Sequence, residues 1–216
     1  QRGEALIAGA ATATPVGDGW SLSGTARYVL DGAEADLVVV PARTDDGLGL
    51  FLVSGGDATA ERLPTLDLTR KLAHVTFDGA PGEPLAAAPA TEVLDRVLAL
   101  GAVAIALEDI GGAARVLDEA VQYAKDRVQF GRPIGSFQAI KHKCADMLVA
   151  VESAKSAAYY AAWAAAEDPE ELALVAPLAK SYCSEAYFHC AAENIQIHGG
   201  IGFTWEHDAH LYFKRA

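Results

Sequence analysis

The stretch "RVQFGRPIGSFQAIKHKCADM", residues 127–147, decides how the second half of the chain folds. Pro133 fixes φ, lacks an N–H donor and disfavours the α conformation for Arg132, so a helix is expected to break at this point. Apolar residues recur every three or four positions on both sides of the break, as they do in amphipathic helices. The sequence therefore predicts one helix that ends near Val128 and a second that begins after Ser136, with Ser136 as its N-cap.

Four helices are predicted in this half. The first begins at the N-cap Thr91, the second ends near residue 166, the third spans about 169–197, and the fourth begins near Trp205. Gly199 and Gly200 supply the stop of the third helix. The Gly111-Gly112 pair inside the first helix predicts a close helix contact, because each glycine costs about 1 kcal/mol relative to alanine. Short connections favour an antiparallel four-helix bundle.

The first half of the chain has a different residue pattern. Residues 19–32, 35–43, 47–55 and 72–80 are short β-rich runs that are separated by Gly, Asp and Pro clusters. The segment "GAPGEPLAAAPA", residues 79–90, is interpreted as a linker. The predicted fold class is α+β, with a small antiparallel β domain over residues 1–88 and a helical bundle domain over residues 89–216.

Composition limits the partners and the location. The 216 residues carry a formal net charge of −12, which argues against nucleic acid and anionic membrane surfaces as partners. No uninterrupted run of about 18 apolar residues occurs, and residues 1–20 lack the pattern of a signal peptide. We therefore expect a cytoplasmic chain without membrane insertion. Cys183 and Cys190 lie seven apart on one helix face, which favours buried small residues over a redox pair or a soft metal site.

Two segments carry candidate binding chemistry. Arg127, Phe130 and Gln138 offer a guanidinium fork, an aromatic face and an amide near one corner, which suits pyrophosphate, adenine and ribose. The alternative is simple helix capping by cations. The glycines of "QIHGGIGF", residues 196–203, allow a ligand to approach the backbone closely, but they also suit an ordinary helix terminus. This segment is not a Rossmann fingerprint, since no strand precedes it.

Taken together, these motifs resemble a known family. "RVQFGRPIGSFQAIKHKCADM" and "IQIHGGIGFTWEHD", residues 195–208, strongly resemble the C-terminal helical domain of acyl-CoA dehydrogenases. "GDGWSLSGTARYVLDGAEADLVVVPAR" and "LDLTRKLAHVTFDGA" resemble the middle β domain of that family. The segment "GGIGFTWEHD", residues 199–208, is similar to the corresponding segment in a bacterial branch of the family that has heteromeric members. Some of these members act on steroid side-chain thioesters.

The resemblance implies a flavoprotein of lipid metabolism that binds FAD noncovalently and performs the first oxidation of β-oxidation. Members convert an acyl-CoA thioester to the trans-2-enoyl form: a carboxylate removes the α-proton, and the β-hydrogen leaves as hydride to flavin N5. The implied partners are acyl-CoA, an electron acceptor such as an electron-transfer flavoprotein, and further subunits in a homo- or hetero-oligomer, either a dimer or a tetramer. A non-catalytic subunit of a heteromer, which contributes only FAD contacts and an interface, is the alternative.

Seven residues match cofactor-contacting positions of the family: Arg127, Gln129, Phe130, Gln138, Gln196, Gly199 and Gly200. The arginine matches the one that reaches the FAD pyrophosphate, typically of a neighbouring subunit. The next two match positions along the diphosphate and adenine, and Gln138 matches a polar position beside the adenosine. The last three match a "QxxGG" corner that closes over the diphosphate end from another protomer.

The catalytic residue is not identified by the resemblance. In most members the base is a glutamate at a position beyond Ala216, and in a minority it stands where this chain has Gly101. Tyr28 replaces the tryptophan that shields the flavin, and Leu30 replaces a threonine whose hydroxyl bonds near flavin N5. Glu206 is interpreted as a first-turn acid of the fourth helix.

Histidines are the remaining metal-ligand candidates. His198, His207 and His210 do not repeat the spacing of a zinc ligand set, so no metal site is predicted. His198 is expected to serve in packing.

Overall fold

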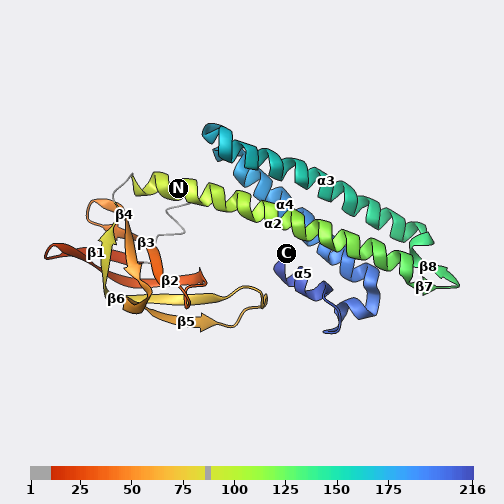
Figure 1. Cartoon of the computed structure of the whole chain (residues 1–216), viewed down its shortest axis with the longest axis horizontal. Helices are drawn as coiled ribbons and strands as arrows, with labels where there is room; N and C mark the ends of the chain where they lie inside the picture. Colours follow the sequence, from red (N-terminus) through yellow and green to blue (C-terminus); the bar gives the residue numbers. More distant parts are fainter. Residues whose placement is uncertain (1–10, 86–88) are drawn as a thin grey trace. The chain divides into compact units, whose positions relative to one another are not determined.

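The computed structural model describes residues 11–85 and 89–216 (Figure 1). The chain divides into two compact units, Gln1–Val97 and Leu98–Ala216, and each is described separately. Described helices and strands occupy both units, so the fold is α+β. Two interpretations fall partly outside the described residues. The absence of a signal peptide at residues 1–20 involves residues 1–10, and the linker at residues 79–90 involves residues 86–88.

The first unit is built on a six-stranded sheet in the described range 11–85. Its strands are β1 (Ala11–Val16), β2 (Gly19–Leu30), β3 (Leu37–Thr44), β4 (Gly47–Ser54), β5 (Thr59–Leu63) and β6 (Leu72–Pro84), with a 3-10 turn at Gly55–Asp57. The strand order is β2-β1-β3-β4-β6-β5, and β2 also pairs with β6, which closes the sheet on itself. The interior is filled by alternate apolar residues, among them Leu22, Phe51, Val53 and Phe77.

The expected β domain is confirmed in outline and corrected in three details. β1 pairs with β3 in parallel, at Thr12 opposite Arg43, so the sheet is not purely antiparallel. β1 and β5 were not predicted from the sequence. β6 continues to Pro84, through the first half of the predicted linker.

Four described helices follow: α2 (Ala90–Asp126), α3 (Gln138–Glu167), α4 (Pro169–His198) and α5 (Ala209–Arg215). A short hairpin of β7 (Val128–Gln129) and β8 (Arg132–Pro133) joins α2 to α3, and 3-10 turns occupy Ile134–Ser136 and Gly199–Phe203. The helix interior is rich in alanine: Ala106, Ala154, Ala158 and Ala161 are all fully buried. Small side chains let the helices approach closely.

The glycine pair in α2 has two distinct environments. A Cβ at Gly112 would lie 2.4 Å from Cζ of Tyr187, whose side chain is buried on α4. A Cβ at Gly111 would meet no atom within 4 Å. The predicted close helix contact is therefore confirmed for Gly112 alone.

Helix ends follow local sequence at some positions. The Asp168 side chain accepts from the Glu171 N–H at 3.1 Å and caps α4, and Gly199, at φ +63°, ends that helix. Ser136 is not the cap of α3, because its hydroxyl donates to the Pro133 carbonyl at 2.7 Å and closes the preceding 3-10 turn.

Two further helix boundaries differ from the prediction. α2 begins at Ala90, one residue before Thr91, so Thr91 is not its N-cap. α5 begins at Ala209 rather than near Trp205 and has no acid in its first turn, so the role expected for Glu206 is wrong. Thr204 explains the delay: its backbone N–H and its hydroxyl both bond the Ile201 carbonyl, at 3.0 Å and 2.8 Å, which prolongs the 3-10 turn.

One described helix, α2, is long and apolar enough to cross a membrane by length and composition. The same test is passed by core helices of soluble proteins. Val103, Ala106 and Ile110 of α2 belong to the buried cluster shared with α3 and α4.

Candidate functional site

The first group of predicted residues lies at the β7–β8 hairpin. The Arg127 N–H donates to the Tyr123 carbonyl, and the Arg127 carbonyl accepts from the Ile134 N–H, both at 2.8 Å. The two loop residues, Phe130 and Gly131, have φ of +55° and +75°. Two consecutive positive φ values characterise the tight two-residue turns that join the strands of a β-hairpin. Glycine tolerates a positive φ better than phenylalanine does.

Phe130 is therefore strained, and it is also 93% exposed. Its ring meets that of Phe137 edge to face at 6.1 Å between centroids, and the Arg132 guanidinium lies 4.1 Å above the Phe137 ring. An exposed ring on a strained backbone gains little within this chain, and such positions are enriched in binding sites. The hairpin holds Phe130 where a molecule outside the chain can stack on it.

Arg127, Gln129 and Gln138 are also exposed. Arg132 is engaged on Phe137, whereas the described bonds of Arg127 are those of its backbone. The Gln129 amide donates to the Val128 carbonyl at 2.7 Å. This corner thus carries an exposed guanidinium and an exposed aromatic ring three residues apart, and their joint binding of a cofactor stays a prediction.

The second group lies at the end of α4. Gln196, Gly199 and Gly200 are exposed, and the Gly199 N–H closes the helix on the carbonyls of Ile195 and Gln196. A Cβ at Gly200 would meet no atom within 4 Å, whereas a Cβ at Gly202 would lie 2.8 Å from the Ile195 carbonyl oxygen. Gly202 is therefore required by packing within the chain, while the open backbone at Gly200 can admit a ligand.

The structure connects the two groups through their neighbours rather than directly. Tyr123, one turn before Arg127, stacks on His198, next to Gly199, with ring centroids 4.2 Å apart. In the described part of the chain, no hydrogen bond joins the four predicted residues of the first group to the three of the second. Within one copy, therefore, the predicted contacts form two adjacent exposed surfaces and not a closed pocket.

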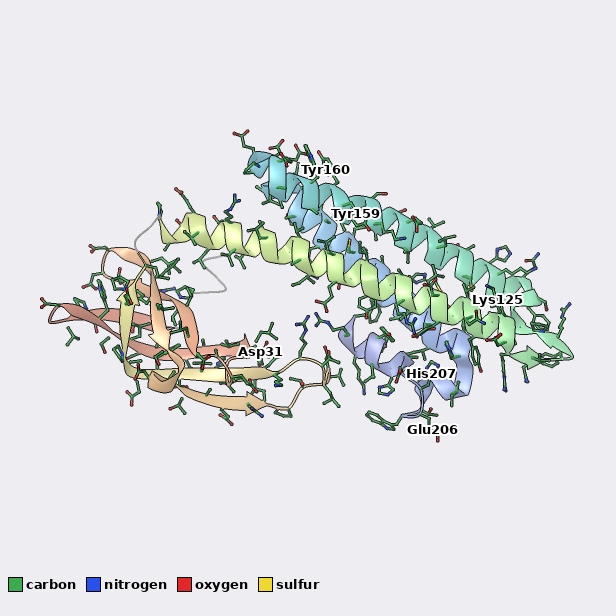
Figure 2. The ribbon with its side chains drawn as sticks, viewed as in Figure 1. Asp31, Lys125, Tyr159, Tyr160, Glu206 and His207 are labelled. Atoms are coloured by element: carbon green, nitrogen blue, oxygen red, sulfur yellow. The ribbon has the colours of Figure 1, made fainter. Side chains whose placement is uncertain are left out.

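The structure also contains a hollow that sequence reasoning missed, and none of the seven predicted residues lines it. It has a volume of about 370 Å³ and is lined by residues of α2, the end of α4 and the segment before α5: Glu119, Gln122, Tyr123, Asp126, His198, Glu206, His207 and Asp208. Figure 2 labels Glu206 and His207 on that segment. The two acids of α2 lie about two turns apart, the other two follow Trp205 closely in sequence, and only folding joins the two sets. Four carboxylates make this hollow unsuited to a diphosphate.

His198 is 5% exposed in this hollow, and its Nδ1 lies 2.8 Å from the Asn194 carbonyl oxygen. A carbonyl only accepts, so Nδ1 carries the proton and donates. Burial lowers the pKa of His198, and the nearby His207 acts in the same direction. The packing role expected for His198 is confirmed.

This lowered pKa makes the stability of the helical unit depend on pH. The unfolded chain takes up the proton near the ordinary value of 6.5, before the folded state does, so stability is full above that pH and falls as pH drops toward the lower folded pKa. We expect the urea concentration at the unfolding midpoint of the wild type to decrease when the pH is lowered from about 7.5 to about 5.5. The decrease should be smaller in His198→Gln. The control is His189→Gln, at an exposed position of the same helix. Equal pH dependence in all three proteins would contradict the assignment.

The flavin-segment match in the first unit lies on β2. The β2–β6 register shifts between Ala26 and Val29, and Tyr28, within this bulge, has φ +58° and is exposed. Its ring meets His74 edge to face at 5.5 Å. Leu30 is exposed and supplies no hydroxyl. The strand therefore presents an aromatic face at this position without the side-chain donor that the family places nearby.

Gly101 stands where a minority of the family carries the base, and two carboxylates that follow it in α2, Glu108 and Asp109, are already engaged. A Cβ at Gly101 would meet no atom within 4 Å, so this position is open but carries no acid. Glu108 pairs with Arg215 at 2.7 Å. Asp109 is buried and accepts from the Ser184 hydroxyl at 2.9 Å, and burial raises the pKa of its carboxyl group.

The residues of the helical unit fit the diphosphate and adenine ends of FAD by their chemistry. Arg127 offers a fork of N–H donors, Phe130 offers an exposed ring, and Gly200 leaves its backbone open. The first unit fits the flavin ring less completely, because Leu30 has no donor.

Residues 91–216 match the family model "Acyl-CoA dehydrogenase, C-terminal domain". The acyl-CoA dehydrogenase IpdE2 of Mycolicibacterium smegmatis is 43% identical over 193 residues, which are 88% of this chain and 55% of the relative.

Two solved structures are also similar. A chain in the structure of the electron transferring flavoprotein of Acidaminococcus fermentans aligns with a TM-score of 0.92 and 28% identity, over 97% of this chain and 58% of that one. A chain of the ChsE4-ChsE5 complex from Mycobacterium tuberculosis aligns with a TM-score of 0.83 and 32% identity, over 95% and 56%. The chain thus spans little more than half the length of these relatives, and it belongs to the acyl-CoA dehydrogenase family.

Proposed function

We propose that this chain is part of an FAD-dependent acyl-CoA dehydrogenase that oxidises an acyl-CoA thioester to the trans-2-enoyl-CoA. The observation that carries the proposal is the hairpin corner, where the strained and exposed Phe130 stands beside the exposed Arg127. Strain with no benefit inside the chain is explained if an outside molecule stacks on the ring. Membership of the family supports FAD as that molecule.

The chain's own residues then have separate tasks. The Arg127 guanidinium donates to the pyrophosphate, while Gln129 and Phe130 line the diphosphate and adenine, and Gln138 bonds the adenosine side. Gln196, Gly199 and Gly200 close over the diphosphate end of a cofactor that another subunit holds. FAD, when bound, supplies the acceptor for hydride.

Assembly is part of the proposal, because the two exposed surfaces are incomplete in one copy. We propose a homo- or hetero-oligomer, a dimer or a tetramer, in a soluble cytoplasmic setting, with electrons passed to an acceptor such as an electron-transfer flavoprotein. Residues 1–88 act as the middle β domain, and residues 89–216 act as the C-terminal domain in an antiparallel four-helix arrangement.

A second function is favoured by specific observations. Gly101 carries no acid, although a side chain would fit there, and Leu30 offers no hydroxyl near the flavin segment. Both features suit a non-catalytic subunit that lends FAD contacts and an interface to a partner that carries the base. Relatives in a heteromeric complex, ChsE4-ChsE5, support this alternative.

The visible spectrum distinguishes the two functions. The chain is purified alone and with co-expressed neighbouring gene products, and acyl-CoA is added under anaerobic conditions. Flavin absorbance that bleaches in the lone chain contradicts the non-catalytic alternative. Flavin that appears only with a partner contradicts autonomous catalysis, and the absence of flavin from every preparation contradicts the whole proposal.

Gly200→Ala is the matched variant for this experiment. A Cβ at this position meets nothing within the chain, so the unfolding midpoint should stay within error of wild type. We expect flavin content to fall several-fold, because a cofactor that approaches the backbone would meet the new methyl group. Unchanged flavin would show that the Gly199-Gly200 corner does not contact FAD.

A further inference from the structure

The hollow between the ends of α2 and α4 has no role in the proposed flavin contacts. It contains four carboxylates, of Glu119, Asp126, Glu206 and Asp208, and its volume of about 370 Å³ exceeds what a single water fills. At neutral pH such a lining attracts positive charge.

Glu119 is the first observation that points to a ligand. Its Oε1 accepts from Nε of Arg115 at 2.9 Å, while its Oε2 is buried without a hydrogen-bond partner among the described residues. A carboxylate oxygen without a donor is costly to bury, so an N–H donor that entered the hollow would remove this cost.

His198 is the second and independent sign. His198 is only 5% exposed, and it lines the hollow. Because Nδ1 donates to the Asn194 carbonyl, Nε2 carries a lone pair and acts as an acceptor. In the described part of the chain, Nε2 has no hydrogen-bond partner. The acceptor lone pair of this ring nitrogen thus adds to the unused carboxylate oxygen of Glu119 at the lining of the hollow.

Flat rings complete the site. Tyr123 stacks on His198 at 4.2 Å, and the His207 ring lies 4.3 Å from that of His198. His207 Nδ1 accepts from the Ala209 N–H at 3.0 Å, so its proton is on Nε2. Planar cations and ammonium groups bind favourably to aromatic faces, in addition to pairing with carboxylates.

A metal ion fits these residues less well than an organic cation. Within residues 11–85 and 89–216, no group of three or more His, Cys, Asp or Glu side chains is arranged to hold a metal. The volume is also larger than one ion needs. The required ligand carries positive charge, several N–H donors and a few heavy atoms.

We propose that this hollow is a binding site for an organic cation, a guanidinium or primary ammonium group, which donates to Glu119 Oε2 and His198 Nε2. The group comes either from a free small amine or from an Arg or Lys side chain of another subunit. The site is separate from the FAD contacts, so its occupancy does not depend on the proposed function.

The test uses the full chain, labelled with ¹⁵N, and follows the backbone amides of residues 198–208 by NMR. The probes are N-acetylarginine amide and its neutral urea isostere, N-acetylcitrulline amide. We expect the arginine probe to shift these amides and to bind at least about tenfold more tightly than the citrulline probe, the difference that charge-assisted hydrogen bonds produce. Equal affinity of the two probes would overturn the proposal.

Variants locate the site. Glu119→Gln should weaken the arginine probe by about tenfold or more, and Glu206→Gln, at an exposed lining position, should weaken it several-fold without risk to folding. The matched control is Glu152→Gln, since Glu152 pairs with Lys155 on α3, outside the hollow. Unchanged affinity in both lining variants would also refute the site.

Sedimentation in the presence of excess N-acetylarginine amide identifies the source of the cation. Dissociation of an oligomer assigns the cation to a neighbouring subunit, whereas unchanged sedimentation with probe binding assigns it to a free amine, and both results support the site. Flavin content is measured in the same variants and should equal that of the wild type. A chain without flavin would therefore contradict the proposed function while leaving the cation site in place.

Discussion

Arg127→Ala is expected to lose FAD while the chain stays folded. The side chain is exposed, and its described bonds belong to the backbone, so truncation removes little from the helical unit. A charge-assisted contact to pyrophosphate contributes about 1.5–3 kcal/mol, which corresponds to roughly ten- to hundredfold weaker FAD binding. Flavin absorbance per protein after gel filtration, and FAD titration of the apoprotein, measure this loss.

Two companion variants make the Arg127 result specific. Arg132→Ala removes a guanidinium from the same hairpin, but one that lies on the Phe137 ring, so flavin content should remain near that of the wild type. Arg127→Lys keeps the charge and loses the fork, so its affinity should be intermediate. Wild-type flavin content in Arg127→Ala would refute the pyrophosphate role, and equal loss in Arg132→Ala would indicate hairpin damage instead.

Gly112→Ala and Gly111→Ala are expected to change stability in opposite directions. At position 112 the new methyl group would lie 2.4 Å from the ring of Tyr187, which is only 2% exposed and has little room to shift. Overpacking of this kind costs about 1–3 kcal/mol, of which the better helix propensity of alanine returns up to about 1 kcal/mol. At position 111 the methyl group meets nothing, so only the propensity gain of about 0.5–1 kcal/mol remains.

Urea unfolding followed by helical circular dichroism measures this pair. Because both variants add the same methyl group to adjacent positions of one helix, differences in the unfolded state cancel to a good approximation. A stabilised Gly112→Ala, or a destabilised Gly111→Ala, would contradict the packing described for α2 and α4.

Much of the helical half could be predicted because its boundaries are local. Pro133 breaks the chain through its own ring geometry, and Gly199 ends α4 through a backbone conformation that favours glycine. These effects act within a few residues, so a single sequence contains them. The predicted Ser136 cap failed because a competing local acceptor, the Pro133 carbonyl, took its hydroxyl.

The parts that were missed depend on partners distant in sequence. β5 reads "TAERL" and has no apolar alternation, so it becomes a strand only because β6 offers it a ladder of hydrogen bonds. β1 likewise depends on pairing with β2 and β3. Gly111 and Gly112 are identical in sequence terms, and only the position of Tyr187 distinguishes them.

Some features of the candidate site are likewise local in sequence, whereas others depend on distant segments. The sequence by itself determined the residue types of the hairpin corner, the positions of the helix breaks and the family, because each depends on short motifs. Only the tertiary structure decided that Phe130 is strained and exposed, that His198 is buried, and that acids of α2 and of residues 206–208 line one hollow. The physical reason is that the burial of His198 and the clustering of the acids depend on contacts between segments about 80 residues apart, which no local pattern records. The strain at Phe130 depends instead on the pairing of β7 with β8, which forms around a two-residue turn.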